Sequence, residues 1–199
     1  MTRKTVSARL IARVGVLGAL SALLFLIPGI PIVPPIYKLD FSTVPVLLGG
    51  FSLGYVPGLL ILLIKDLVGL TNSSSMGVGE LADFLASAAM MLTAVAIYRR
   101  CHSRRGALIS LVAGTLVMTA AAALINAFIV IPFYSTAMNL PTEAIVSMIG
   151  NVIPAVDSLP RLIAFATTPF NLLKGIVLSA ITFLLYKRLS PLLKGEGKR

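Results

Sequence analysis

The sequence Thr168-Pro169-Phe170-Asn171-Leu172-Leu173-Lys174-Gly175 opens the last long hydrophobic segment of the chain. Pro169 suits the first turn of a helix, where its missing backbone N–H breaks no hydrogen bond. Asn171 and Lys174 are three residues apart and therefore share one face of that helix. An ammonium group that faces lipid near the bilayer centre costs about 2.5–3.5 kcal/mol. Lys174 therefore either snorkels toward the membrane surface or, with Asn171, binds a polar ligand in a protein-lined cavity.

The composition indicates an integral membrane protein. Of the 199 residues, 57% are hydrophobic and 12% are charged, whereas soluble domains carry about 25% charged residues. Basic residues lie beside hydrophobic runs in three clusters, which are Arg3/Lys4/Arg9/Arg13, Arg99/Arg100/Arg104/Arg105 and Lys187/Arg188/Lys194/Lys198/Arg199. Such clusters are typical of cytoplasmic loops. The net charge of +10 is therefore explained by membrane topology, and we expect no nucleic-acid partner.

The hydrophobic segments predict an all-α fold, a single membrane domain over residues 1–199 with six transmembrane helices. The predicted spans are 8–27, 41–53, 54–70, 80–98, 106–133 and 169–186. Glycines interrupt the apolar run from 41 to 70, and only its division into two helices leaves all three basic clusters, and both termini, in the cytoplasm. These two helices are short for a hydrocarbon core of ~30 Å, so neighbouring helices must shelter them. Residues 141–160 are expected to form a re-entrant or surface helix on the outer side.

Polar residues within the apolar segments fall toward the outer half of the predicted bundle. They are Asp40, Lys65, Asp66, Glu80, Asn126, Asn171 and Lys174. We therefore expect one polar-lined pocket that opens outward, capped by the proline-rich loop from Pro28 to Asp40. The candidate substrate-binding residues are Asp40, Glu80, Asn126, Asn171 and Lys174. Purely structural roles stay open for several of these features, because the loop can rest on lipid headgroups, Glu80 can serve the helix dipole and Asn126 can bond another helix.

Catalysis finds little support in the sequence. There is no histidine among the polar residues of the predicted pocket and no Gly-x-x-x-x-Gly-Lys-Ser/Thr phosphate loop, so we expect no catalytic residue and no ATPase activity in this chain. A single histidine, His102, and a single cysteine cannot build a metal centre, and we expect neither a metal nor a cofactor. The predicted pocket suits a neutral and partly flat ligand. Its amides and lysine match carbonyl oxygens or ring nitrogens, and its carboxylates match hydroxyl and N–H groups.

Two other classes of function remain open at this point. One is an autonomous ion-coupled transporter that uses Asp66 or Asp83 as its proton or sodium site. The other is a membrane enzyme or an assembly factor that uses Glu80 and Asp83 on one helix face.

Five stretches together resemble a known family over nearly the whole chain. They are Leu39-Asp40-Phe41-Ser42 with Gly49-Gly50-Phe51, Gly77-Val78-Gly79-Glu80-Leu81-Ala82-Asp83-Phe84-Leu85, Ile97-Tyr98-Arg99-Arg100 with Arg105-Gly106-Ala107-Leu108, Ala113-Gly114-Thr115-Leu116-Val117-Met118-Thr119 with Asn126, and Thr168 to Gly175. The sequence resembles the riboflavin-specific S components (RibU) of energy-coupling factor (ECF) transporters. The Pro-Phe-Asn-x-x-Lys-Gly and Gly-Glu-Leu-Ala motifs favour riboflavin over thiamine or folate, and another vitamin is the alternative.

The resemblance implies a six-helix substrate-binding subunit in the plasma membrane of a prokaryotic cell. It implies a transmembrane coupling protein and two cytoplasmic ATPase subunits as partners. It further implies that Glu80, Asn126, Asn171 and Lys174 hold the isoalloxazine and ribityl groups of riboflavin, and that the loop ending at Asp40 caps the site. By the same resemblance, the subunit topples in the membrane to release its substrate inside.

Helix one of the family docks the coupling protein through an Ala-x-x-x-Ala motif. This sequence has glycine at the first position of the motif, in two overlapping registers. These registers are Gly15-x-x-x-Ala19 and Gly18-x-x-x-Ala22, and the sequence leaves open which of the two faces the partner.

Overall fold

The computed structural model describes residues 7–34 and 36–194, with side chains as far as Tyr186. The basic residues Arg3, Lys4, Lys198 and Arg199 lie outside the described residues. The chain is a mostly helical integral membrane protein. Its elements are α1 (Ala8–Leu26), β1 (Ile30–Val33), β2 (Tyr37–Leu39), α2 (Thr43–Leu53), α3 (Tyr55–Gly69), η1 (Leu70–Asn72), α4 (Val78–Tyr98), α5 (Arg104–Ile125), η2 (Asn126–Val130), α6 (Ile131–Ala137), α7 (Thr142–Gly150), α8 (Leu159–Leu162), η3 (Ile163–Thr167) and α9 (Thr168–Lys194).

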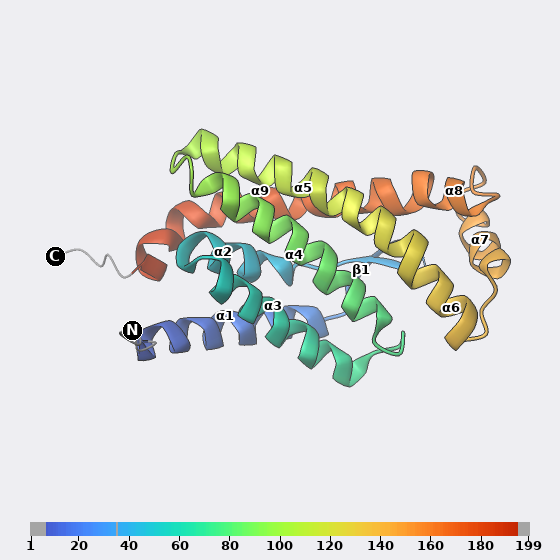
Figure 1. Cartoon of the computed structure of the whole chain (residues 1–199), viewed down its shortest axis with the longest axis horizontal. Coiled ribbons are helices and arrows are strands. Elements are labelled where there is room, and N and C mark those ends of the chain that lie inside the picture. Colours follow the sequence, from blue (N-terminus) through green and yellow to red (C-terminus); the bar gives the residue numbers. More distant parts are fainter. Residues whose placement is uncertain (1–6, 35, 195–199) are drawn as a thin grey trace, which may run out of the picture.

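Within the described residues, five helical stretches are long and apolar enough to cross a membrane. They are Ala8–Leu26, Tyr55–Asn72, Val78–Tyr98, Arg104–Ala137 and Leu159–Tyr186. The bundle is elongated (Figure 1), and α1 starts and α9 ends at the same end as the turn between α4 and α5. The short helices α6, α7 and α8 lie at the opposite end of the bundle.

Helix α2 is shorter than the others and lies inside the bundle. Every residue from Thr43 to Phe51 is buried, as expected of a helix that is apolar on all sides. Glycines permit this close packing, because a Cβ at Gly49 would clash with the Cδ1 of Ile61. The chain turns from α2 into α3 at Gly54, whose φ of 104° favours glycine. The structure therefore has two helices between residues 41 and 70, and neighbouring helices shelter the first.

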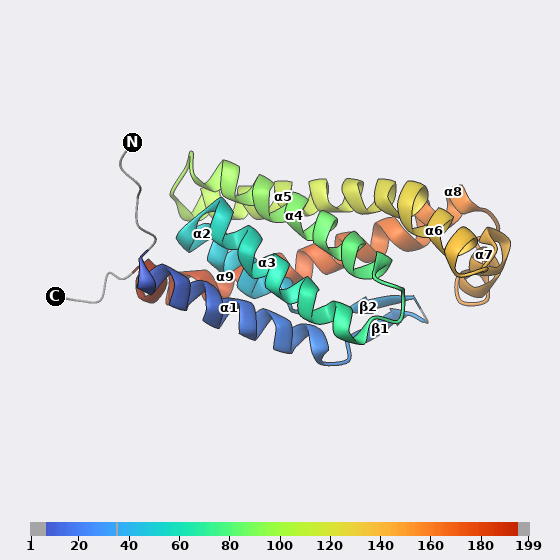
Figure 2. The ribbon, with the colours of Figure 1, turned by 60° about the horizontal axis from the view of Figure 1, so that its bottom comes forward.

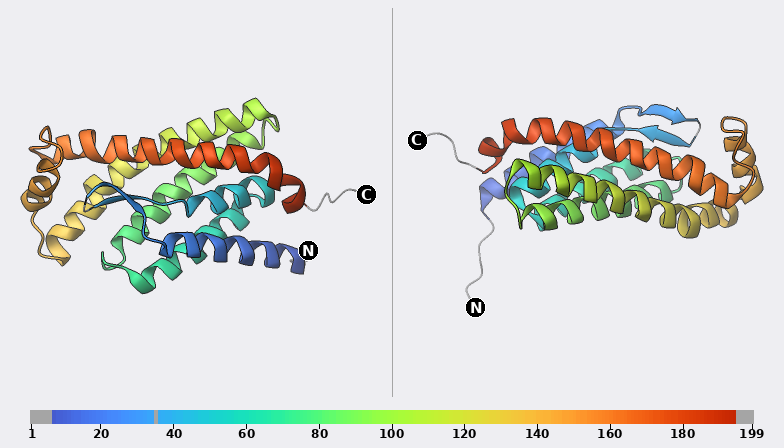
Figure 3. Two further views of the ribbon diagram at one scale, coloured as in Figure 1. Left: turned by 180° about the vertical axis from the view of Figure 1, so that it is seen from behind. Right: turned by 90° about the horizontal axis from the view of Figure 1, so that it is seen from above.

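The proline-rich segment after α1, predicted as a capping loop, forms an antiparallel two-stranded hairpin, β1–β2. The hairpin lies beside α9 (Figure 3), against the second hydrophobic cluster of the molecule. In the rotated view of Figure 2, β1 and β2 lie next to the end of α3. A sheet of two strands suffices here because α9 and the short helices cover one of its faces.

Three predicted segments differ from the structure at the outer end of the bundle. The last helical path begins at Leu159, ten residues before Pro169, because α8 and η3 lead directly into α9. The predicted helix over 141–160 is shorter in the structure, where α7 ends at Gly150 and residues 151–158 connect it to α8. The fifth helical path is longer than 106–133, since α5, η2 and α6 continue from Arg104 to Ala137.

Candidate binding site

A cavity of about 590 Å³ lies in the half of the bundle that holds the hairpin. Its walls come from the end of α1, the hairpin, the loop between α3 and α4, and the helices α4, α5, η2 and α9. Its volume falls within the range of small-molecule sites, which is about 300–1,000 Å³. The lining includes Phe25, Tyr37, Asp40, Glu80, Asp83, Ala86, Asn126, Val130, Tyr134, Phe170, Asn171 and Lys174. Polar and apolar side chains share the lining about equally, since Lys38, Asn72, Ser74 and Ser75 also belong to it. A cavity of this volume with convergent polar groups is a candidate ligand site.

Two π-helical turns place the asparagines of the cavity. Asn126 is the first residue of η2, and Asn171 follows η3 by four positions. Each side-chain amide donates one hydrogen bond of 2.8 Å to its own helix, Asn126 to the carbonyl of Ala122 and Asn171 to that of Thr167. Each amide therefore keeps a second N–H and a carbonyl oxygen for a ligand. Single π-helical turns inside α-helices are frequent at functional sites.

A proline follows each π-helical turn at the same distance. η2 ends at Val130, two residues before Pro132, and η3 ends at Thr167, two residues before Pro169. A proline inside a helix has no N–H to donate and its ring clashes with the preceding turn. A widened turn just before the proline relieves that clash and lets the helical path continue. The prolines therefore explain locally why the helices bulge where the asparagines face the cavity.

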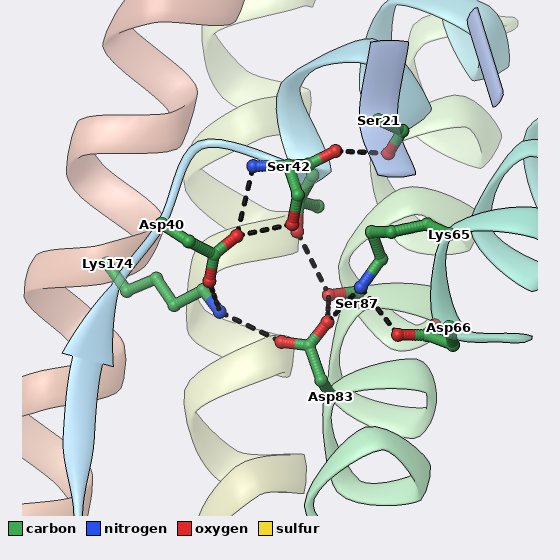
Figure 4. A network of polar contacts seen from close by, with 9 residues as sticks. Ser21, Asp40, Ser42, Lys65, Asp66, Asp83, Ser87 and Lys174 are labelled. Carbon is green, nitrogen blue, oxygen red and sulfur yellow. Dashed lines mark hydrogen bonds and ion pairs between the residues drawn. The ribbon is translucent and has the colours of Figure 1, made fainter. Parts of the chain in front are cut away.

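Lys174 belongs to a buried network of charged residues (Figure 4). Its ammonium lies 3.0 Å from a carboxylate oxygen of Asp40 and 2.8 Å from one of Asp83. The other oxygen of Asp83 accepts from Lys65, whose ammonium also lies 2.7 Å from Asp66. Charges of opposite sign in contact offset much of the cost of burying each group. The structure thus answers how a lysine is accommodated in this helix, since Lys174 faces carboxylates and not lipid.

Asp40 connects this network to the hairpin. Its carboxylate accepts from the backbone N–H of Ser42 at 3.0 Å and from the Ser42 hydroxyl. Ser21 of α1 in turn donates to the carbonyl of Ser42 at 2.5 Å. Asp40, the residue that follows the hairpin, is therefore held directly by Ser42 and by Lys174 of α9, and α1 holds Ser42 in turn.

Glu80 lies at the edge of the cavity in the first turn of α4. One of its carboxylate oxygens, Oε2, accepts from the hydroxyls of Ser73 and Ser75, at 2.8 and 3.0 Å. The loop between α3 and α4 thereby fixes the position of the carboxylate. The Oε1 atom remains an acceptor for hydroxyl or N–H groups of a ligand.

Tyr37 fastens the hairpin to the last helical path. Its hydroxyl lies 2.6 Å from that of Thr167, and its ring packs against Phe170 with centroids 5.0 Å apart. Burial raises the pKa of Tyr37 to about 12, which the hydrogen bond to Thr167 partly opposes. The phenol therefore stays neutral at physiological pH, in a contact that closes one side of the cavity.

The structure brings together all five predicted substrate-binding residues. The same cavity is lined by Asp40, Glu80, Asn126, Asn171 and Lys174. Their contacts with a ligand stay a prediction. Lys65 and Asp66, which the sequence predicts in the same pocket, are buried behind Asp83 and do not line it.

Sequence reasoning missed the contribution of Tyr37 and Phe170, and it did not count Asp83 among the substrate-binding candidates. The spacing of Glu80 and Asp83 on one helix face was the available signal for Asp83. Tyr37 gave no comparable signal, because its position depends on the hairpin.

The structure distinguishes the two small-residue registers of α1. Gly18 and Ala22 are buried, and a Cβ at Gly18 would lie 2.8 Å from the Cδ1 of Ile64 in α3. Gly15 and Ala19 are exposed, and nothing lies within 4 Å of a Cβ built at Gly15. Gly18 and Ala22 therefore pack inside the molecule, and Gly15 and Ala19 lie on its outer surface.

Comparisons with known proteins agree on one family. A family model described as "ECF transporter, substrate-specific component" matches residues 9–186. Riboflavin transporter RibU of Staphylococcus aureus (strain TCH60) is 37% identical over 165 residues, which cover 83% of this chain and 81% of that protein. Riboflavin transporter FmnP of Bacillus subtilis (strain 168) is 27% identical over 165 residues, which cover 81% of this chain and 80% of that protein.

The fold has a relative among solved structures. A structure described as "Structure and mechanism of the S component of a bacterial ECF transporter" matches with a TM-score of 0.72 and 34% sequence identity. The match covers 94% of this chain and 98% of that chain. Sequence motifs, family model and fold therefore lead to the same assignment.

Proposed function

Because the chain belongs to the family of substrate-specific components of ECF transporters, we propose that it captures riboflavin outside the cell for ATP-driven uptake. Relatives that cover about four fifths of the chain are riboflavin transporters. The observation that carries the proposal is the convergence of Asn126, Asn171 and Lys174 on one cavity of suitable volume.

The chemistry of the cavity suits the two parts of riboflavin. The flat ring system presents carbonyl oxygens and ring nitrogens at its edge, which match the amides of Asn126 and Asn171 and the ammonium group of Lys174. Phe170, Val130 and Ala86 offer apolar surface to its faces. Glu80, with the serine-rich loop beside it, offers acceptors to the hydroxyl groups of the ribityl chain. The chain thus binds its substrate without altering it, and its part in transport is capture.

The same proposal includes the arrangement in the membrane. Residues 1–199 form a single membrane domain with six spans, which are the five long helical stretches and the short helix α2. Both termini are cytoplasmic. The basic cluster of the α4–α5 turn supports this orientation, since it lies at the end of the bundle where α1 begins. The cavity then opens outward in the plasma membrane of a bacterium, and the hairpin that leads to Asp40 caps it.

Uptake requires partners, because this chain carries no ATPase motif. We propose a transmembrane coupling protein and two cytoplasmic ATPase subunits, as the family assignment implies. The exposed Gly15/Ala19 face of α1 is the docking surface for the coupling protein, since Gly18 and Ala22 already pack inside the chain. An ion-coupled mechanism is less well supported, because Asp66 and Asp83 both contact lysine ammonium groups.

A titration of the detergent-purified chain with riboflavin tests the proposal. Flavin fluorescence is expected to be quenched at one riboflavin per chain and submicromolar concentration, with no displacement by excess thiamine. Absence of quenching in a folded sample would contradict the flavin assignment. A panel of other vitamins would then identify the ligand of the same cavity. Liposomes that contain only this chain are expected to take up no riboflavin, with or without an ion gradient.

A further inference from the structure

Asp83 lies between two lysines that come from different helices (Figure 4). One of its carboxylate oxygens faces Lys174 of α9, which lines the cavity, and the other faces Lys65 of α3. The side chain of Lys65 is 0% exposed and does not line the cavity. Its ammonium also lies 4.5 Å from the ring centroid of Phe25 in α1. Lys65 is therefore placed to act on the cavity through its ion pair with Asp83, besides its contact with the ring of Phe25, which also lines the cavity.

The donors of Lys174 set what this network can do. An ammonium group has three N–H donors, and Asp40 and Asp83 accept two of them. One donor is left for a ligand, and its direction follows from the positions of the two carboxylates. Asp40 stands at the end of the hairpin, whereas Asp83 stands inside α4, one of the long helices of the bundle. The position of the Asp83 carboxylate is therefore fixed by a long helix, whereas the position of the Asp40 carboxylate depends on the hairpin.

Lys65 and Lys174 bind different oxygens of Asp83. Because Lys65 occupies the second oxygen of Asp83, only one oxygen of this carboxylate is directed at Lys174. A carboxylate without that second partner can engage Lys174 with both oxygens. Asp66 holds Lys65 in turn, through a contact of 2.7 Å.

We propose that Asp83 and Lys65 are positioning residues that act through Lys174 and direct its remaining donor at the substrate. The inference rests on the proposed function, since it concerns the same cavity. It assigns a role to two charged residues outside the five substrate-binding candidates. It further predicts that their effect on affinity disappears when Lys174 is absent.

A double-mutant cycle tests this dependence. We expect Asp83→Asn to weaken riboflavin binding about tenfold in the otherwise native chain, and less than about twofold in a Lys174→Ala background. Asp157→Asn is the matched control, because Asp157 is exposed and pairs with Arg161 at the surface. The control is expected to leave affinity unchanged in both backgrounds. Thermal melting of each purified variant verifies that it is folded.

The contribution of Lys65 is tested by the pair Lys65→Met with Asp66→Asn, which removes one charge of each sign and leaves the net charge unchanged. The loss of riboflavin affinity caused by this pair of substitutions is likewise expected to vanish in the Lys174→Ala background. If Asp83→Asn does not fold, Asp83→Glu shifts the carboxylate by one methylene group and enters the same cycle.

The outcomes separate this inference from the proposed function. A native chain that binds no riboflavin overturns the proposed function and the inference with it. A native chain that binds riboflavin, together with equal losses in both backgrounds, leaves the function standing and gives Asp83 a purely structural role. Unchanged or tighter binding in Asp83→Asn also overturns the inference.

Discussion

Two lysines are buried in helices that otherwise carry mainly apolar side chains. Lys65 and Lys174 face three carboxylates, from Asp40, Asp66 and Asp83. Removing one member of a buried ion pair costs about 3–5 kcal/mol, because it leaves an uncompensated charge. Such an arrangement contributes little net stability. Its value at the residue scale is that it holds charged donors in defined directions within a membrane protein.

Lys174→Ala is expected to weaken riboflavin binding at least tenfold, which corresponds to about 1.4 kcal/mol. The reason is the loss of the ammonium donor that lines the cavity beside Asn171. Fluorescence titration of the folded variant measures the change. Arg161→Ala is the control, since it removes an exposed cation of α8 that does not line the cavity. Equal affinity of the native chain and the lysine variant would remove Lys174 from the site.

Tyr37→Phe removes the hydroxyl that contacts Thr167 and leaves the ring packed on Phe170. A hydrogen bond of this kind is worth about 0.5–1.5 kcal/mol, so we expect riboflavin to dissociate several-fold faster. Stopped-flow displacement measures the rate. Tyr55→Phe is expected to leave the rate unchanged, because Tyr55 is the first residue of α3 and does not line the cavity.

The pKa of Tyr37 fixes the pH window of this contact. Its folded pKa is raised to about 12 by burial, above an ordinary value near 10. The neutral phenol is therefore favoured by folding, and its contribution is fully present below about pH 10 and is lost as the pH rises toward 12. We expect no pH dependence from this contact between about pH 6 and 9. A dissociation rate that changes in this window and stays constant in Tyr37→Phe would contradict the assignment.

At the scale of single elements, α1 has two faces with different surroundings. The face with Gly18 packs against Ile64 of α3, and the face with Gly15 is open. Gly18→Val is expected to destabilise the chain by about 1–3 kcal/mol, because the added methyl groups overpack the contact with α3. Thermal melting in detergent measures the effect. A fully native melting temperature would show that α1 tolerates bulk at its inner face.

Gly15→Val is the matched variant on the outer face. It is expected to fold and to bind riboflavin as the native chain does, and to lose copurification with the coupling protein. The reason is that close approach of two membrane helices requires small residues at the contact. Unimpaired assembly of this variant would move the docking surface away from the Gly15/Ala19 face.

At the scale of the whole molecule, charge and polarity are divided between the two ends of the bundle. The α4–α5 turn and the start of α5 carry four arginines within seven residues, at the end where α1 begins. The charged residues of the network lie in the half that holds the cavity. This division supports the proposed orientation, because basic clusters are typical of the cytoplasmic side of a membrane protein.

Cys101 reports the orientation without any substitution. It is the only cysteine of the chain, and it is exposed in the turn between α4 and α5. In intact cells it is expected to react with a membrane-permeant maleimide and not with an impermeant one. Asn151→Cys in a Cys101→Ser background, at the exposed residue after α7, is expected to show the opposite accessibility. Labelling of Cys101 from outside would contradict the six-span topology.

Much of this architecture was predictable because it depends on local chemistry. The run of apolar residues, the glycine at position 54 and the polar residues at 126, 171 and 174 are all visible in the sequence. The motif-based resemblance to ECF S components is confirmed by the comparisons. Family membership also agrees with the expectation of a binding subunit without catalysis.

The remaining features depend on tertiary contacts. Prolines at 31 and 34 suggest a loop, yet the segment pairs as a hairpin because α9 and the short helices cover it. Pro169 suggests a helix start, yet the helical path continues upstream because η3 accommodates the ring. The pairing of Asp83 with two lysines joins residues 18 and 91 positions apart in the sequence, and no local pattern gives such a separation.

An experimental structure of the purified chain with riboflavin tests the central claim most directly. We expect density for one flavin in the cavity between the hairpin and α9, with the edge of its ring system within hydrogen-bond distance of Asn126, Asn171 and Lys174. The ribityl chain is expected toward Glu80. Flavin density at another place in the molecule, or an empty cavity at saturating riboflavin, would contradict the account.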